Sequence, residues 1–346
     1  MNFFSPVMRF SPPPPQAESD TTRLTVNVSS APTCTKCNPH DIQECSCNPC
    51  IPYAYALKRD NAIEEVADRL AVLLANEETR YKIPSHVTTD WQELSLNSTA
   101  HAGSAADGFL LEQQLKASPT VTIAEARAKM CEWNYQVVDH LNLDREVVSV
   151  SMSYLDRAVI TGNQDTMSTR TFQLVTITAL YLATKLYEAN NVVTRTCDLL
   201  SFFAYLCRGV FASGDIIKME LALLESLHWD VHPPTPQAFC LELVRLVPSE
   251  VPPVTRHNLL QMAQFLIELS VCDTRFVTKS PSDIALAAMI NAFELPALAH
   301  YKIEFLDLVH KIGLAFDNDR VIGCYDILQE LYNQGEYDLL TQMDCN

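Results

Sequence analysis

The sequence predicts an all-α protein with two helical domains in tandem. Apolar residues recur at helical spacing in successive segments, whereas no stretch of useful length shows the alternation expected of a strand. A proline-rich connector, His228 to Pro236, divides these segments into two sets. Each set holds about 100 residues, which is a usual domain size.

The segment from Thr171 to Lys185 is apolar on nearly every side of a helix. A helix without a polar face has to be surrounded by other elements. It is also too short to cross a bilayer, which takes about 20 apolar residues. We therefore expect it to be the central helix of the first domain, with Leu174 in its core and Lys185 where it emerges.

The other helices follow from apolar periodicity and from capping residues. Glu125 stands three residues after Thr122, the spacing of a capping box, and Gly162 is expected to end the next helix. In the segment Asp215 to Leu227, four residues are expected to point inward: Ile217, Leu221, Leu224 and Leu227. The helices are expected at 61–78, 122–141, 144–162, 171–185, 197–206, 215–227, 237–247, 256–271, 282–293, 297–313 and 319–332.

Composition and charge restrict the class of partner. The 346 residues carry a formal net charge of −17, which argues against direct nucleic-acid binding, because phosphate contacts rely on clustered Lys and Arg. The first ten residues lack the charged and apolar regions of a secretory signal, so we expect an intracellular protein without a membrane anchor. Proteins are the expected partners.

Residues 1–53 have the composition of a disordered tail, rich in Pro, Ser and Cys. Its paired thiols could hold a structural zinc ion through Cys34, Cys37, Cys47 and Cys50. The alternative is a cysteine-rich, redox-sensitive tail without metal, and no other cofactor is expected. Residues 54–120 are expected to form an N-terminal helix followed by a flexible insertion, and residues 336–346 a second tail.

Motifs for catalysis are absent from the sequence. Its eight glycines form no Gly-x-Gly pair, and neither a Gly-x-Ser-x-Gly elbow nor a His-Glu-x-x-His motif occurs. His228 and His232 are four apart, but the prolines that follow leave them without a third ligand in the sequence. The sequence therefore predicts a protein that is not an enzyme.

Four charged residues lie within the apolar helices of the first domain: Arg127, Asp156, Lys185 and Glu220. A charge on a packed helix needs a partner or a path to solvent. Arg127 and Asp156 could form a structural ion pair, and Lys185 and Glu220 could converge on one surface. The alternative is that all four are ordinary solvated charges.

At these residues the sequence resembles the cyclin family. Five signature positions of that family are filled, by Arg127, Asp156, Leu174, Lys185 and Glu220. The resemblance implies tandem five-helix cyclin folds, a first cyclin box at 121–232 and a second fold at 233–335. The segment Leu73 to Tyr81 is similar to the helix before the box in D-type and plant-like cyclins. The matching segments are 126–133, 152–157, 182–188, 218–221 and 227–236.

The resemblance implies a non-catalytic activating subunit of a cyclin-dependent protein kinase, acting in the cell cycle in nucleus and cytoplasm. Lys185 and Glu220, with Leu182 and Leu186 beside them, would bind the kinase αC helix and reposition it. The family's substrate-docking patch is degenerate here, because Lys129 brings a charge where the family has an apolar residue. The matching positions are Ala126, Lys129, Met130, Trp133 and Gln136.

Two alternatives share the fold that the resemblance implies. A transcription-associated or nutrient-sensing cyclin would use the same kinase-binding residues with a different partner. An initiation-factor-like transcription adaptor would match the tandem folds and the cysteine-rich N-terminus, but the charge of −17 weighs against contact with DNA.

Overall fold

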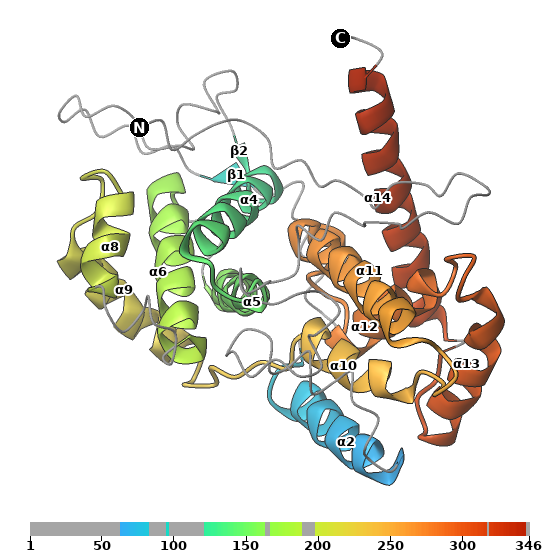
Figure 1. The fold of residues 1–346 in the computed structure, drawn as a ribbon. Coiled ribbons are helices and arrows are strands. Elements are labelled where there is room, and N and C mark those ends of the chain that lie inside the picture. Colours follow the sequence, from blue (N-terminus) through green and yellow to red (C-terminus); the bar gives the residue numbers. More distant parts are fainter. Residues whose placement is uncertain are drawn as a thin grey trace. The chain divides into compact units, whose positions relative to one another are not determined.

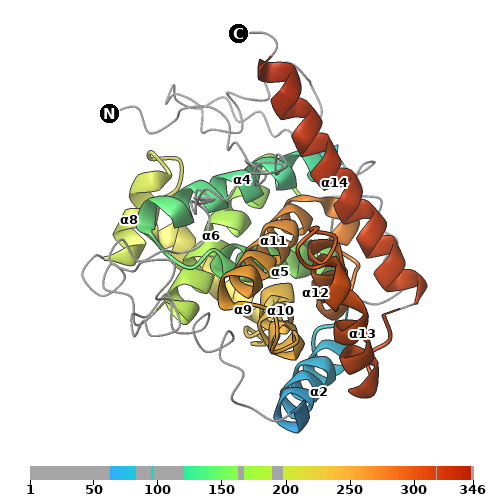
Figure 2. The same cartoon turned by 45° about the vertical axis from the view of Figure 1, so that its right-hand side comes forward.

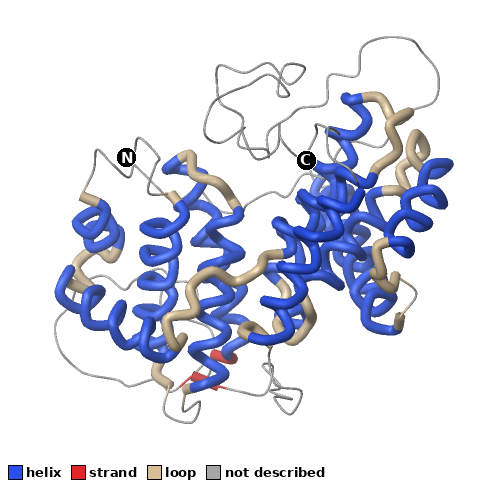
Figure 3. Tube along the Cα trace, turned by 90° about the horizontal axis from the view of Figure 1, so that it is seen from below, coloured by secondary structure: helices blue, strands red, loops and turns tan. Residues whose placement is uncertain are grey.

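A computed structural model describes residues 63–82, 95–96, 121–162, 167–188, 198–316 and 318–343. Within these ranges nearly all of the regular secondary structure is helical, which confirms the all-α prediction (Figure 3). The strands found there are β1 (Ser95–Leu96) and β2 (Val121–Thr122), which pair antiparallel with Ser95 opposite Thr122. Such short strands leave no alternating pattern for sequence analysis to detect.

The chain divides into two compact units. The N-terminal unit comprises 70–235 together with Ser270–Pro281, and the C-terminal unit comprises 236–269, 282–346 and the residues up to Arg69. The change from one unit to the other after Thr235 falls within the proline-rich connector. Helix α2 (Ile63–Thr79) contributes residues to both units.

The N-terminal unit is built around helix α6 (Thr169–Tyr187), which lies between α8 and α9 on one side and α4 and α5 on the other (Figure 1). Its closest packing is against α5 and α9. The surrounding helices are α4 (Ile123–Leu141), α5 (Glu146–Thr161), α8 (Leu199–Leu206) and α9 (Ser213–Ser226). The apolar run at 171–185 thus forms the central helix, as its composition predicts.

Burial along α6 follows this position. Every residue from Val175 to Thr184 is buried, whereas the three residues from Lys185 onward are exposed. Leu174, expected in the core, is only half-buried, and Phe172 and Val175 are buried instead. The helix therefore becomes accessible at its last turn.

Helix α4 begins at the capping box that the sequence predicts. The Thr122 hydroxyl accepts the Glu125 N–H, and the Glu125 carboxylate accepts the Thr122 N–H, both at 3.2 Å. At the next helix start, the Asp144 carboxylate accepts the N–H of Glu146 at 2.9 Å. Gly162 follows the last residue of α5, as expected.

Two side chains of α5 fix the connector that leaves the unit. Arg157 donates to the carbonyls of Asp230 at 2.8 Å and Leu227 at 3.1 Å. The Tyr154 hydroxyl donates to the carbonyl of Val231. These bonds satisfy backbone carbonyls outside the helices, so the start of the connector, as far as Val231, is held against α5.

The C-terminal unit has α12 (Pro281–Ala292) at its core, where every residue from Asp283 to Ile290 is buried (Figure 2). In the first turns of α2, Arg69 Nε lies 2.8 Å from Glu242 Oε2 within this unit. The other elements are α10 (Pro236–Leu243), the 3-10 turn Val244–Leu246, α11 (Pro253–Cys272), the 3-10 turn Ala299–Tyr301, α13 (Lys302–Lys311) and α14 (Asp319–Met343).

The end of α11 and the segment after it belong to the N-terminal unit. This segment, Ser270–Pro281, includes the 3-10 turn Thr274–Phe276, whose Phe276 side chain is buried. The turn packs against α4. The first helical domain therefore includes residues from beyond the connector, which the predicted boundary at 232 leaves out.

Candidate functional site

Lys185 and Glu220 lie side by side on the surface of the N-terminal unit. Lys185 is in the exposed last turn of α6, Glu220 is in the middle of α9, and their Nζ and Oε1 atoms are 2.9 Å apart. The lysine side chain is 51% exposed and the glutamate side chain 13%. The structure thus brings together two residues that stand 35 positions apart in the chain.

Lys185 and Glu220 form a salt bridge. The hydrogen bond to Glu220 raises the pKa of Lys185 above its ordinary value, against a smaller opposing effect of burial. The Lys185 ammonium also lies 5.7 Å from the ring centroid of Tyr181, one turn earlier on α6. The half-exposed Lys185 ammonium and the mostly buried Glu220 carboxylate therefore lie together where a partner could contact them.

Exposed apolar side chains flank this pair. On α9, Ile217 is 50% exposed and Leu221 is 53% exposed, and Leu186 on α6 is 36% exposed. Large aliphatic side chains with this exposure next to a charge pair are typical of a protein-binding surface. We call this set the α6–α9 surface: Lys185, Leu186, Ile217, Glu220 and Leu221.

The prediction that Ile217 and Leu221 point inward is wrong. The buried residues of this region are Ile216 and Leu223 on α9, followed by Leu227. Two apolar stripes run along α9, and helical periodicity favours each equally. Leu227 is buried as predicted and Leu224 is half-buried, whereas Ile217 and Leu221 lie at the surface. The second apolar stripe on α9 is the signal for a binding face that the sequence analysis missed.

Leu182 does not belong to this surface. It is 2% exposed, so its side chain lies in the core of the N-terminal unit. Trp229, which the sequence analysis did not single out, is 63% exposed just after α9, in a left-handed backbone conformation with φ of 64°. Its place in the Leu-His-Trp-Asp stretch was the available signal.

Arg127 and Asp156 form a buried, two-point ion pair between α4 and α5. The Nε–Oδ1 and Nη2–Oδ2 distances are 2.7 and 2.8 Å, and Nη1 donates to the carbonyl of Val271 at 2.9 Å. Burial by itself lowers the pKa of Arg127, but the Asp156 carboxylate outweighs it and the net shift is upward. The Val271 contact lies 144 residues away in sequence and had no signal there.

The positions of the degenerate docking patch lie on α4. Ala126, Met130 and Trp133 are buried, and Lys129 and Gln136 are half-buried. The apolar members thus serve the core of the N-terminal unit. They present no open apolar surface for an inserted leucine.

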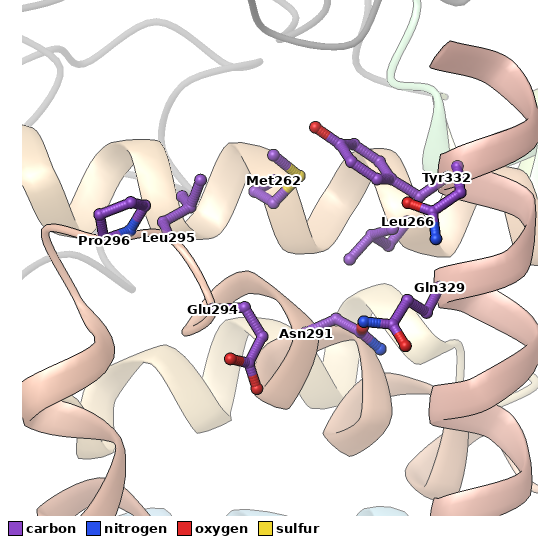
Figure 4. A pocket seen from close by; sticks show the side chains of 9 residues that line it. Met262, Leu266, Asn291, Glu294, Leu295, Pro296, Gln329 and Tyr332 are labelled. Carbon is purple, nitrogen blue, oxygen red and sulfur yellow. The ribbon is translucent and has the colours of Figure 1, made fainter. Parts of the chain in front are cut away.

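A groove occurs in the C-terminal unit, between α11, the end of α12 and α14 (Figure 4). Its volume is about 200 Å³. The sequence analysis singled out none of its lining residues, among which Met262, Leu266 and Tyr332 are apolar and Asn291, Glu294 and Gln329 are polar.

The candidate zinc ligands Cys34, Cys37, Cys47 and Cys50 lie outside the described residues. Among the residues that are described, no cluster of three or more His, Cys, Asp or Glu side chains could hold a metal ion. Within the same part of the chain, no helix is long and apolar enough to cross a membrane.

Family models match both units. The model of the cyclin N-terminal domain matches residues 106–232, and that of the cyclin C-terminal domain matches residues 234–343. The chain belongs to the cyclin family. The tandem cyclin folds expected from the sequence are thereby confirmed.

This cyclin is similar to several curated cell-cycle cyclins. It is 28% identical to cyclin-D3-3 of Arabidopsis thaliana over 207 residues, which cover 58% of this chain and 54% of the relative. It is 26% identical to a G2/mitotic-specific cyclin-B of Hydra vulgaris over 226 residues, covering 61% and 57%. The chain thus spans little more than half the length of these relatives.

Two further similarities concern other cyclins. Identity to G1/S-specific cyclin-E1 of Danio rerio is 27% over 174 residues, covering 48% of this cyclin and 40% of the relative. A viral cyclin of Herpesvirus saimiri is a structural neighbour with a TM-score of 0.48 and 18% identity, covering 62% of this chain and 87% of that one. The curated relatives are thus named for D, B and E types alike.

Proposed function

We propose that this cyclin is the activating, regulatory subunit of a cyclin-dependent serine/threonine protein kinase that controls cell-cycle progression. The α6–α9 surface would bind the kinase αC helix and the segment leading into it. The observation that carries this proposal is the Lys185–Glu220 pair, 2.9 Å apart and flanked by exposed Ile217 and Leu221. We place this activity in the nucleus and cytoplasm.

The charged pair suits the recognition of backbone groups. The Lys185 ammonium has three donors and Glu220 uses one carboxylate oxygen for it, so both retain hydrogen-bonding capacity for a partner. Each hydrogen bond to a charged group contributes about 1.5–3 kcal/mol. Because the pair is already formed and partly exposed, redirecting it costs little.

The aliphatic side chains supply the non-directional part of binding. Ile217 and Leu221 are each about half exposed, so covering the rest of each contributes roughly 1 kcal/mol. A shift of the kinase from about 1% to 99% active needs about 5.5 kcal/mol of differential affinity. Two charged hydrogen bonds and this apolar contact together reach that magnitude.

The proposed mechanism is a shift of population. The kinase performs the phosphoryl transfer with its own residues, and this chain binds its active arrangement more tightly than its inactive one. In the active arrangement the αC glutamate pairs with the lysine that positions ATP. Every interaction made only with that arrangement therefore favours activity.

A charge exchange tests the α6–α9 surface without removing the internal ion pair. The double variant Lys185→Glu with Glu220→Lys keeps opposite charges adjacent. It places an acceptor at position 185 and a donor at position 220, the reverse of the wild type. A matched control exchanges two exposed charges away from this surface, on α13, as Lys311→Glu with Asp307→Lys. Each protein is used to capture kinase from native extract, and the bound chain and its phosphorylation of histone are measured.

The wild type and the control are expected to recover kinase activity. The Lys185→Glu, Glu220→Lys variant is expected to bind the kinase at least about tenfold more weakly, which corresponds to about 1.4 kcal/mol of binding free energy. Equal recovery by a folded exchanged variant would contradict the proposed surface. Failure of the wild type to bind any kinase would overturn the proposed function. When the wild type captures a kinase, the identity of that kinase also distinguishes a cell-cycle cyclin from a transcription-associated one.

A further inference from the structure

Two cysteines of the N-terminal unit lie with their sulfur atoms in contact. Cys131 is on α4 and fully buried, and Cys272 is the last residue of α11 and half-buried. Their Sγ atoms are 3.4 Å apart. A disulfide bond is about 2.05 Å long, so the two sulfurs need to approach by only about 1.4 Å.

The backbone beside both cysteines is fixed by neighbouring contacts. Arg127, one turn before Cys131 on α4, donates to the carbonyl of Val271, which directly precedes Cys272. On the other side of Cys272, the Asp273 carboxylate accepts the N–H of Arg275 at 2.8 Å. The two thiols are therefore held next to each other by groups other than themselves.

We propose that Cys131 and Cys272 form an oxidation site, at which a hydroperoxide converts the two thiols into one intramolecular disulfide. The inference is independent of the proposed function, because neither cysteine belongs to the α6–α9 surface. A disulfide of this kind in an intracellular protein would be a reversible, redox-sensing bond.

The reaction proceeds in two steps with hydrogen peroxide as oxidant. The Cys272 thiolate attacks one peroxide oxygen: the S–O bond forms, the O–O bond breaks, and the departing hydroxide takes up a proton to leave as water. The Cys131 sulfur then attacks the Cys272 sulfenic acid, forming the S–S bond and breaking the S–O bond. The departing hydroxide takes the Cys131 proton, so two thiols and one peroxide give one disulfide and two waters, with two electrons passing from sulfur to oxygen.

Accessibility sets the order of these steps. Cys272 is partly exposed, so peroxide reaches it first. Burial and the hydrogen bond with Cys272 raise the pKa of Cys131, which keeps it a thiol until a sulfenic acid forms beside it. Cys131 is thus protected from peroxide itself and acts as the resolving partner.

Other buried cysteines provide controls within the same chain. Burial raises the pKa of Cys207 and of Cys240 to about 12 each. The Cys207 thiol donates to the carbonyl of Phe203 at 3.1 Å, and the Cys240 sulfur lies 3.6 Å from the thioether of Met289. Cys207 and Cys240 are as deeply buried as Cys131, but the contacts described here are with a carbonyl and a thioether, not with a second thiol.

The test uses the 346-residue chain with serine at the seven cysteines outside the described residues, namely Cys34, Cys37, Cys45, Cys47, Cys50, Cys197 and Cys345. The protein is treated with hydrogen peroxide, and peptides are analysed by mass spectrometry without reduction. We expect one cross-linked peptide joining Cys131 to Cys272, lighter by two hydrogens and restored by dithiothreitol. It should form at least about tenfold faster than any modification of Cys207 or Cys240.

Two single variants separate the roles. In Cys131→Ala we expect no cross-link and a Cys272 sulfenic acid that dimedone traps, and in Cys272→Ala we expect Cys131 to resist peroxide. The cross-linked form of the serine-substituted chain should melt at a higher temperature than its reduced form, because the disulfide ties together residues far apart in sequence. The proposal is overturned if peroxide gives no Cys131–Cys272 cross-link in the folded chain, or if Cys272 goes directly to sulfinic acid.

Discussion

Arg127 and Asp156 meet through two parallel hydrogen bonds, Nε to Oδ1 at 2.7 Å and Nη2 to Oδ2 at 2.8 Å, with the arginine side chain 3% exposed and the aspartate side chain 10% exposed. The fork of the guanidinium matches the carboxylate, which gives the pair geometric specificity as well as energy. It therefore fixes α4 against α5 in one register.

Removing one member of this pair should destabilise the protein strongly. Asp156→Ala leaves the Arg127 guanidinium buried and without a counter-charge, which costs about 3–5 kcal/mol in free energy of unfolding. Urea unfolding followed by circular dichroism measures it. The double variant Arg127→Met with Asp156→Leu should lose less than Asp156→Ala alone, and a single-variant loss below about 1 kcal/mol would contradict the structural role.

Two leucines on α9 should separate binding from stability. Leu221 is 53% exposed and Leu223 is 2% exposed, although they are two positions apart on one helix. Leu221→Ser should change the free energy of unfolding by no more than about 0.5 kcal/mol while weakening capture of the kinase. Leu223→Ala should cost about 2–5 kcal/mol through the cavity that it leaves. Comparable losses of stability in the two variants would mean that Leu221 is core.

Glu146 should make stability depend on pH. Burial, together with the nearby charge of Asp144, raises the pKa of Glu146 from 4.5 to about 7, against the hydrogen bond that Thr235 donates to it. Between these two values the folded state holds a proton that the unfolded state has released, so stability falls as pH rises from about 5 to 7.

Each unit of this pKa difference corresponds to about 1.4 kcal/mol. We expect the free energy of unfolding to fall by about 1–3 kcal/mol between about pH 5 and pH 7. Urea unfolding at several pH values measures it. Glu146→Gln should flatten this dependence, because glutamine has no proton to release. An unchanged slope in that variant would assign the effect to another group.

The capping box at the start of α4 should contribute a smaller, local amount. Thr122→Ala removes the hydroxyl that accepts the Glu125 N–H and should cost about 1 kcal/mol in free energy of unfolding. Thr122→Ser retains an acceptor and serves as the control. If both substitutions have the same effect, the hydroxyl does not act as a cap.

The helices of this cyclin could be predicted from its sequence because their signals are local. The Thr122–Glu125 box, the apolar run of α6 and the prolines after His232 each act within a few residues, and the helices lie close to the expected positions. Lys185 and Glu220 stood out because charge is rare in apolar stripes. The choice of face on α9 failed because Ile217 and Ile216 are adjacent and both strongly apolar, so only tertiary packing selects between them.

Long-range partners had no such signal. The carbonyl of Val271 is a backbone group that every residue type carries, so nothing in the sequence marks it as the acceptor for Arg127. Likewise, Cys131 and Cys272 each fit a helical apolar pattern, and only the fold brings their sulfurs to 3.4 Å.

The return of residues 270–281 to the N-terminal unit has a consequence for the order of events during synthesis. When synthesis has reached the proline-rich connector, the chain contains α4, α5, α6, α8 and α9, but not the segment that supplies the acceptor for Arg127. The first domain is completed only after most of α11, which belongs largely to the second, has emerged. The two domains of this cyclin are interleaved in sequence, and a fragment that ends at the connector lacks the carbonyl of Val271 that accepts from Arg127.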